Sequence, residues 1–263
     1  MNRPTLLCTL AAAALCARLH AQEVPQQAPM KPEETEIWSP EPPVVTPSAT
    51  WGGAPSDAKV LFDGHNLDAW VAAADHKSAP GWIVHDGIVT VAKKAGNIET
   101  RQRFQDYQFH LEYRIPAGIT GTSQARGNSG LFLASTGPGD RGYELQILDS
   151  YKNKTYVNGM AGSVYKQYIP LANACRPPGE WQTYDVVWTG PRFAADGSLA
   201  SPARLIAFQN GVLIQQDVAL QGETRYIGKP FYAAHGPAPI KLQAHGDHSE
   251  PISFRNIWVR ELP

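Results

Sequence analysis

Cysteine is scarce in this sequence, with 3 in 263 residues. Cys8 and Cys16 lie in an apolar N-terminal stretch, so the rest of the chain contains only Cys175. A disulfide within that part is therefore excluded, even in an oxidising compartment. Cys175 could act as a nucleophile, but nothing in NACRPPGE indicates one, and we interpret it as a small packed residue.

A surplus of basic residues is also lacking. Lys and Arg number 23 against 24 Asp and Glu, and the formal net charge is −1. Without a cationic surplus to release counterions, neither nucleic acid nor an anionic membrane surface is an expected partner.

Long apolar runs are limited to residues 6–17, near the N-terminus. Arg3 precedes this run and the small Ala21 follows it, which is the pattern of a secretory signal peptide covering residues 1–21. The run is too short to cross a bilayer comfortably, so no membrane span is predicted. Acylation at Cys16 is a less favoured alternative, because a leucine precedes it. We therefore expect a periplasmic or secreted protein.

Residues 22–58 contain eight prolines among Glu, Gln, Thr and Ser. This composition cannot form a core and favours extended conformations, so we predict a flexible proline-rich linker. Trp38 and Trp51 are its only aromatic residues, and either could dock on the domain that follows.

Capped runs with helical apolar spacing are missing after the N-terminal stretch. From residue 59 to residue 263 the chain instead alternates short β-rich runs with Gly, Pro and Asn. The Asn-Gly pair at 210–211 and the Asp-Gly pair at 86–87 are typical of two-residue hairpin turns. About 205 residues of this pattern predict one all-β domain, a two-sheet jelly-roll β-sandwich, over residues 59–263.

The stretch YELQILDS, residues 143–150, is the first candidate for a functional strand. Period two places Glu144 and Gln146 on one face and Asp149 on the other, whereas a β-bulge would bring Asp149 to their face. The string resembles the E-x-D-x-x-E strand of family 16 glycoside hydrolases, but Gln146 and Asp149 depart from it. A two-carboxylate mechanism is therefore disfavoured. An edge strand with a solvated face is the structural alternative.

A series of longer motifs runs through the predicted domain. In order, they are LFDGHNLDAW (61–70), GWIVHDGIVTV (81–91), GNSGLFL (127–133), YELQILDS (143–150), AGSVYKQ (161–167), PPGEWQTYDVVW (177–188), NGVLIQQDVAL (210–220), YAAHGP (232–237), LQAHG (242–246) and FRNIWVREL (254–262). With these motifs in this order, the chain resembles the 3-keto-disaccharide hydrolase domain family over essentially all of residues 59–263.

This resemblance implies a concanavalin A-like jelly roll that acts on sugars already oxidised at C3. A ketone at C3 acidifies the C2 hydrogen, so a base can remove it and the C1 substituent can leave by elimination. Water can then add to the product. Such a site needs a base near C2, a donor to the enolate oxygen and an acid for the leaving oxygen.

Three residues are candidates for these catalytic roles. Glu144 is the first candidate for proton transfer, and His245 in LQAHG is the second, because an imidazole exchanges protons near neutral pH. Lys166 in VYKQ is the candidate donor to the enolate oxygen. The structural alternatives are a hydrogen-bonded histidine at a loop end and a solvated lysine at a strand end.

Five residues are candidates for substrate binding. Polar side chains would donate to sugar hydroxyls or orient their neighbours, and a tyrosine would stack on a pyranose ring. These residues are Arg126, Asn128, Gln146, Asp149 and Tyr165. The Gly-rich GTSQARGNSG equally fits a flexible turn, and it lacks the GK[ST] ending of a phosphate loop.

No cofactor is predicted, and no residue is assigned as a metal ligand. His235, His245, Asp247 and His248 form the only metal-like cluster, but their spacing matches no tight metal signature. A divalent ion stays open as an alternative.

We predict an exported enzyme that cleaves or hydrates 3-keto-glycosides by C2 proton abstraction, with a carbohydrate as its partner. Two alternatives stay open. One is a non-catalytic carbohydrate-binding module that uses the same sheet face, and the other is an ordinary jelly-roll glycosidase. The sequence does not indicate an oligomeric state.

Overall fold

The computed structural model describes residues 30–263, and the chain divides into two units at residue 45. The described part of the first unit, residues 30–44, contains one turn of 3-10 helix, η1 (Pro32–Thr35), and all its residues are exposed. The signal peptide predicted for residues 1–21 lies outside the described residues.

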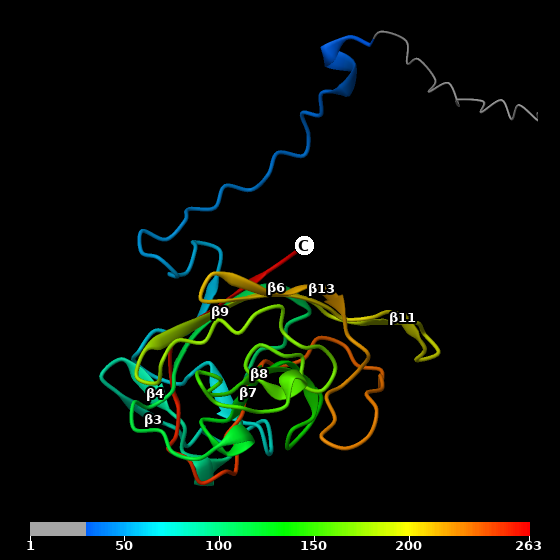
Figure 1. Cartoon of the computed structure of the whole chain (residues 1–263). Coiled ribbons are helices and arrows are strands. Elements are labelled where there is room, and N and C mark those ends of the chain that lie inside the picture. The colour runs from blue at the N-terminus through cyan, green and yellow to red at the C-terminus, as the bar shows by residue number, and fades with distance from the viewer. Residues whose placement is uncertain (1–29) are drawn as a thin grey trace, which may run out of the picture. The chain divides into compact units, whose positions relative to one another are not determined.

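The second unit, residues 45–263, is built from antiparallel β-sheets (Figure 1). The larger sheet has the strand order β13–β12–β9–β6–β15–β4–β3, with β1 also paired to β15, and the smaller has the order β2–β5–β14–β7–β8. A short ribbon, β10–β11, stands apart from both. The predicted all-β, two-sheet jelly-roll sandwich is confirmed.

The strands are short to medium in length. Those of the larger sheet are β1 (Lys59–Phe62), β3 (Ile83–His85), β4 (Ile88–Thr90), β6 (Asp106–Arg114), β9 (Trp181–Thr189), β12 (Arg204–Gln209), β13 (Val212–Ala219) and β15 (Ser253–Glu261). The smaller sheet contains β2 (Trp70–Ala72), β5 (Ile98–Thr100), β7 (Ser129–Ser135), β8 (Gly142–Ile147) and β14 (Lys241–Leu242). The ribbon consists of β10 (Arg192–Phe193) and β11 (Leu199–Ser201).

Helical structure within residues 30–263 is limited to single turns of 3-10 helix. Besides η1, these are η2 (Lys93–Ala95), η3 (Ser123–Ala125) and η4 (Val157–Gly159). No helix in this part of the chain has the length and apolar character needed to cross a membrane.

Both predicted hairpin turns are present. Asn210 and Gly211 join β12 to β13 with φ of 52° and 80°, and Asp86 and Gly87 join β3 to β4 with φ of 50° and 76°. Two consecutive positive φ angles define the type I′ turn, whose twist matches that of the strands it connects.

The space between the sheets is filled by alternate residues of the strands. On β9, Tyr184, Val186 and Trp188 are buried, while the residues between them are less so, as the two-residue period of a strand requires. Leu131 and Leu145 project into the same core from β7 and β8. The residues that alternate with these leucines therefore point away from the core.

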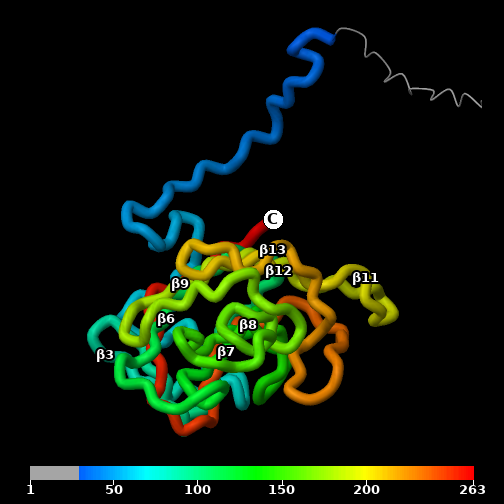
Figure 2. Tube along the Cα trace, in the orientation of Figure 1, coloured from blue at the N-terminus to red at the C-terminus, as the bar shows by residue number. Residues whose placement is uncertain are grey.

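Two tyrosines tie the layers together. Tyr184 on β9 donates a hydrogen bond to the backbone oxygen of Gln146 on β8, at 2.7 Å. Tyr107 on β6 donates to the backbone oxygen of Leu133 on β7, at 2.5 Å. Figure 2 shows β7 and β8 in one layer and β6, β9 and β12 in the other. These bonds satisfy buried hydroxyl groups and fix the backbone of β8 relative to the larger sheet.

β8 ends the smaller sheet, yet all of its residues are buried. Residues 162–165 run along its outer edge, where the backbone of Gln146 exchanges hydrogen bonds with Gly162 and Ser163, and Tyr165 N donates to Glu144 O. The alternative of an edge strand with a solvated face is therefore wrong. The pairing with β7 is unbroken from Glu144 to the end of β8, so this segment has no bulge.

Residues 45–58 belong to the same unit as the sandwich. The backbone oxygen of Gly52 accepts hydrogen bonds from Trp258 Nε1 at 2.8 Å and from Asn256 Nδ2 at 2.9 Å, both on β15. Trp51 itself is 96% exposed, so the backbone makes these contacts and the indole does not.

Candidate active site

The outward face of the smaller sheet carries polar side chains in rows. One row consists of the register partners Glu99, Lys241, Phe132 and Glu144, on β5, β14, β7 and β8. In the next row Gly130 is paired with Gln146. The backbone oxygen of Gly130 accepts a hydrogen bond from the backbone N of Gln243. Period two thus places Glu144, Gln146 and Gln243 on one surface.

These side chains line a cleft of about 310 Å³, here called the Glu144 cleft. Besides Glu144, Gln146 and Gln243, its lining includes Asn128, Tyr165 and His245. Loops complete the wall with Gln124, Asp140, Thr224 and Tyr226. An adjoining outer part of about 380 Å³ shares Asn128, Tyr165, Tyr226 and His245 and adds Tyr156, Lys166 and Asp247.

Glu144 is 6% exposed, and its carboxyl group accepts no hydrogen bond from any described residue. Burial, reinforced by the nearby charge of Asp140, raises the pKa of Glu144 to about 8, although Lys241 acts in the opposite direction. The carboxyl group is therefore protonated at neutral pH and can donate a proton.

Gly130 makes room for this carboxyl group. A Cβ atom at position 130 would lie 2.5 Å from Glu144 Oε1 and 3.0 Å from Phe132 Cε2. Only a glycine leaves the Glu144 side chain free to lie across β7 in this position.

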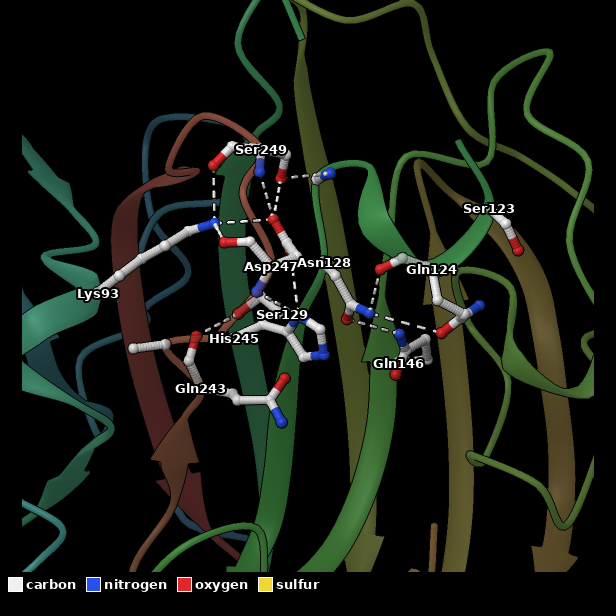
Figure 3. Close-up of polar contacts among 12 residues, drawn as sticks. Lys93, Ser123, Gln124, Asn128, Ser129, Gln146, Gln243, His245, Asp247 and Ser249 are labelled. Atoms are coloured by element: carbon white, nitrogen blue, oxygen red, sulfur yellow. Dashed lines mark hydrogen bonds and ion pairs between the residues drawn. The ribbon is translucent and has the colours of Figure 1, made fainter. Parts of the chain in front are cut away.

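His245 is paired with Asp247 at the other side of the cleft (Figure 3). Its Nδ1 lies 2.8 Å from Asp247 Oδ2. A carboxylate can only accept hydrogen bonds, so Nδ1 carries the hydrogen and Nε2 is the nitrogen left for a ligand. The pair has the geometry of a general base held by an orienting carboxylate.

Asp247 is held as an anion by its surroundings. Lys93 Nζ lies 2.8 Å from Asp247 Oδ1, and both the backbone N and the hydroxyl of Ser249 donate to the same oxygen. Burial opposes ionisation, but hydrogen bonds from His245, Lys93 and Ser249 outweigh it and hold the pKa of Asp247 well below its usual range.

Amide side chains form the polar part of the lining between Glu144 and His245. Gln146 Nε2 donates to Asn128 Oδ1 at 2.9 Å, and Asn128 Nδ2 donates to the backbone oxygen of Gln124 at 2.8 Å (Figure 3). The Oε1 atoms of Gln146 and Gln243 are buried without a partner among the described residues. Such groups are normally satisfied, so they are acceptors available to a polar ligand.

Lys166 lies in the outer part of the cleft, with a left-handed backbone at φ 58°. Its ammonium group donates to the backbone oxygen of Tyr226 at 2.6 Å and lies 4.2 Å from the centre of the Tyr226 ring. The hydroxyl groups of Tyr165 and Tyr156 share a hydrogen bond of 2.6 Å. Tyr226 is 71% exposed, so its ring is open to a ligand at the mouth.

Arg126 and Asp149 do not line either part of the cleft. They form an ion pair, in which Arg126 Nε lies 2.6 Å from Asp149 Oδ2. The two atoms are not aligned as a hydrogen bond. Burial raises the pKa of Asp149, against the opposing effects of the Tyr151 amide and Arg126. The pair lies at the end of β8 and braces the loop that leads to Asn128.

Asp247, Tyr226, Gln124 and Asp140 are cleft residues that sequence reasoning did not assign to the site. Asp247 had a usable signal, because HGD places an acid two residues after the candidate histidine. Tyr226 belongs to a loop far along the chain from β8, and no local pattern associates it with Glu144.

The metal-like cluster noted in the sequence does not come together. Within residues 30–263, no group of three or more His, Cys, Asp and Glu side chains is arranged to hold a metal ion. His245 pairs with Asp247, whereas His235 lies against the hydroxyl of Tyr143, with Nε2 at 3.0 Å.

The fold and the site define a jelly-roll protein with a polar cleft on the outward face of its smaller sheet. The family model of the 3-keto-alpha-glucoside-1,2-lyase-like domain matches residues 57–260. The chain belongs to this family, as its sequence motifs predicted. A comparison with curated proteins finds no match.

Solved structures include similar chains. A proposed glycosyl hydrolase from Parabacteroides distasonis ATCC 8503 is 51% identical, with a TM-score of 0.83, over 90% of this chain and 99% of its own. A second proposed glycosyl hydrolase from the same organism is 21% identical, with a TM-score of 0.56, over 81% of this chain and 95% of its own. The second similarity shows the shared fold alone.

Proposed function

We propose that the protein cleaves 3-keto-glycosides by elimination in the Glu144 cleft. The observation that carries this proposal is the pairing of two unlike proton-transfer groups in one cleft. Glu144 has a pKa of about 8 and is protonated, whereas His245 is held by the anionic Asp247. Two groups are suited to act as acid and base when their environments keep a proton on one of them and leave the other free to accept one.

In the proposed reaction His245 Nε2 removes the C2 proton. The electron pair of the C2–H bond forms the enolate, with negative charge on the C3 oxygen. As the enolate collapses, the bond between C1 and the leaving oxygen breaks, and Glu144 gives its proton to that oxygen. The products are an unsaturated keto sugar and a free hydroxyl compound. Addition of water across the double bond then yields the 3-keto sugar, so the overall change is hydrolysis.

The remaining side chains bind and orient the substrate. Asn128, Gln146 and Gln243 contact sugar hydroxyls through their amides, and Tyr165 and Tyr226 offer ring faces. Lys166 acts chiefly by holding Tyr226, since its ammonium already bonds to the backbone of that residue. Arg126 and Asp149 act as positioning residues, because they lie outside the lining. The scheme uses no cofactor.

An ordinary glycosidase is the second candidate, and one observation favours it. Asp140 also lines the cleft and raises the pKa of Glu144, so two carboxyl groups share this site. A pair of carboxyl groups can cleave an unoxidised glycoside.

The test compares a 3-keto-disaccharide with its unoxidised parent, with sugar release followed by mass spectrometry. Cleavage of the keto form alone is the expected result. Cleavage of the parent at a similar rate would replace the proposal with a glycosidase mechanism. Binding of both sugars without release of either would identify a carbohydrate-binding module.

A further inference from the structure

A second cleft, of about 370 Å³, lies elsewhere on the smaller sheet. It is here called the Glu99 cleft, and its polar lining comprises Asp75, His76, Glu99, Arg103, Ser135 and His235, with Thr136. The loop of residues 136–141 separates the two clefts, because Gly137 lines this one and Asp140 lines the Glu144 cleft. None of these polar residues has a role in the reaction proposed above.

The separating loop is fixed in place by a buried cation. Lys241 Nζ donates to the backbone oxygens of Gly137, Gly139 and Arg141 at 2.7, 2.9 and 3.0 Å. Lys241 has no exposed surface, and all three of its donors are used. The wall between the clefts is therefore held in place by hydrogen bonds within the protein.

The acidic groups of the Glu99 cleft are already satisfied by the protein. Glu99 accepts from His76 Nδ1 at 2.7 Å and from Ser135 Oγ at 2.6 Å, one bond at each carboxylate oxygen. Asp75 accepts from the backbone amides of Lys77 and Ser78, both at 2.9 Å, and from the Ser78 hydroxyl. The Ser78 hydrogen bonds lower the pKa of Asp75 to about 2, so it remains an anion bound to its own turn.

Several donors in the same cleft are unused. Arg103 makes no hydrogen bond or ion pair with any described residue, so its five N–H groups are available. Thr136 Oγ1 is buried without a partner among residues 30–263. His76 is not counted among these donors, because its Nδ1 already donates to Glu99. His235 is not available, because its nitrogens contact Tyr143 and the Gly236 oxygen.

The backbone of His76 supports a dedicated role for its ring. His76 has a left-handed conformation, with φ of 53°, at the turn that follows β2. Non-glycine residues adopt this region at some cost in energy, and such residues concentrate at binding sites. The conformation places the imidazole against Glu99, which fixes the orientation of the ring.

We propose that the Glu99 cleft is a second binding site, which takes a small oxyanion. The free donors of Arg103 and Thr136 match a ligand that only accepts hydrogen bonds, since each carboxylate in the cleft is already hydrogen-bonded by the protein. The planar guanidinium of Arg103 suits two oxygens of one carboxylate or phosphate group, and the Thr136 hydroxyl adds a further donor. The carboxylate of an acidic sugar and a phosphate group share this chemistry. The inference does not depend on the reaction proposed for the Glu144 cleft.

The test is calorimetric titration of the whole protein with glucuronate, inorganic phosphate and glucose. We expect glucuronate or phosphate to bind in the Glu99 cleft and glucose not to bind there. The anion that binds more tightly shows whether the ligand is an acidic sugar or a phosphate. The Arg103→Ala variant should weaken anion binding at least about tenfold, because charge-assisted hydrogen bonds are lost. Arg103 is exposed and makes no hydrogen bond or ion pair with another described residue, so thermal unfolding of the variant should match the wild type.

Two control variants distinguish a site in the Glu99 cleft from general charge attraction and from binding in the Glu144 cleft. Lys94→Ala removes one positive charge from an exposed position outside both clefts and should leave anion affinity within about twofold. Equal losses in the Lys94 and Arg103 variants would mean general charge attraction and overturn the proposal. Anion binding that is lost in Asn128→Ala and kept in Arg103→Ala would place the ligand in the Glu144 cleft, which also overturns it. The proposal is also overturned if neither glucuronate nor phosphate binds.

Discussion

At the scale of single residues, the protonation of Glu144 decides its role. Its pKa is raised from 4.5 to about 8 by burial, so the folded state holds a proton that the unfolded state has lost between these pH values. The free energy of unfolding therefore falls as pH rises through this window. Activity that needs the proton should also fall as pH rises through about 8.

Glu144→Gln separates the two effects. The variant should lose turnover of the 3-keto-disaccharide by about 100-fold or more, because glutamine cannot give up a proton. It should be as stable as the wild type at pH 4, below the unfolded pKa, and more stable at pH 8.5, measured by chemical denaturation. The matched control is Glu180→Gln at an exposed position, which should change neither quantity. Wild-type turnover in the Glu144 variant would exclude it as the acid.

At the scale of elements, the approach of β7 to β8 determines where the Glu144 carboxyl group lies. Gly130 has an ordinary backbone conformation, so alanine is compatible with the strand, but its Cβ would lie 2.5 Å from Glu144 Oε1. We expect Gly130→Ala to displace the carboxyl group and lower turnover at least about tenfold, because misplacement of a catalytic group is costly.

The accompanying loss of stability should be modest, about 1–2 kcal/mol, as for other overpacked sites. Gly118→Ala is the control, since a Cβ at that position meets nothing within 4 Å. Turnover and unfolding of both variants would be measured side by side. Unchanged turnover in Gly130→Ala would show that the position of Glu144 in this structure is not the reactive one.

The same elements show what sequence could predict. Period two correctly placed Glu144 with Gln146, and the Asn-Gly and Asp-Gly turns were visible because they are local signals. The support of His245 was not visible in full, since Lys93 reaches Asp247 across 154 positions. The site combines strand faces, which local periodicity describes, with loops brought in by tertiary packing, which it does not.

At the scale of the whole molecule, the boundary of the folded unit lies before the expected start of the domain. Sequence composition assigned residues 22–58 to a linker, whereas the second unit begins at residue 45. Composition reports what a segment can bury by itself. It does not report hydrogen bonds that its backbone makes with a distant strand, such as those from β15 to Gly52 O.

A pair of truncations tests this boundary. A protein that begins at residue 45 should unfold at the same temperature as the full chain. One that begins at residue 59 leaves Trp258 Nε1 without its acceptor at Gly52 O and removes the cover from His110, whose ring Gly52 closely approaches. Burial opposes the charging of His110, but the carboxylates of Asp185, at 2.7 Å from Nδ1, and Glu112, at 3.8 Å from Nε2, raise its pKa to about 9. Losing this cover, together with the hydrogen bonds from Trp258 Nε1 and Asn256 Nδ2 to Gly52 O, should cost about 2–4 kcal/mol.

For a domain of this size, that loss lowers the unfolding temperature by roughly 4–16 °C, which calorimetry resolves easily. Trp258→Phe removes the indole donor and also shrinks a buried ring that stacks on His110, so it should lower the unfolding temperature through both effects. If the protein that begins at residue 59 unfolds at the full-chain temperature, residues 45–58 contribute nothing to the fold. A drop in both truncations would instead assign a stabilising role to residues before 45.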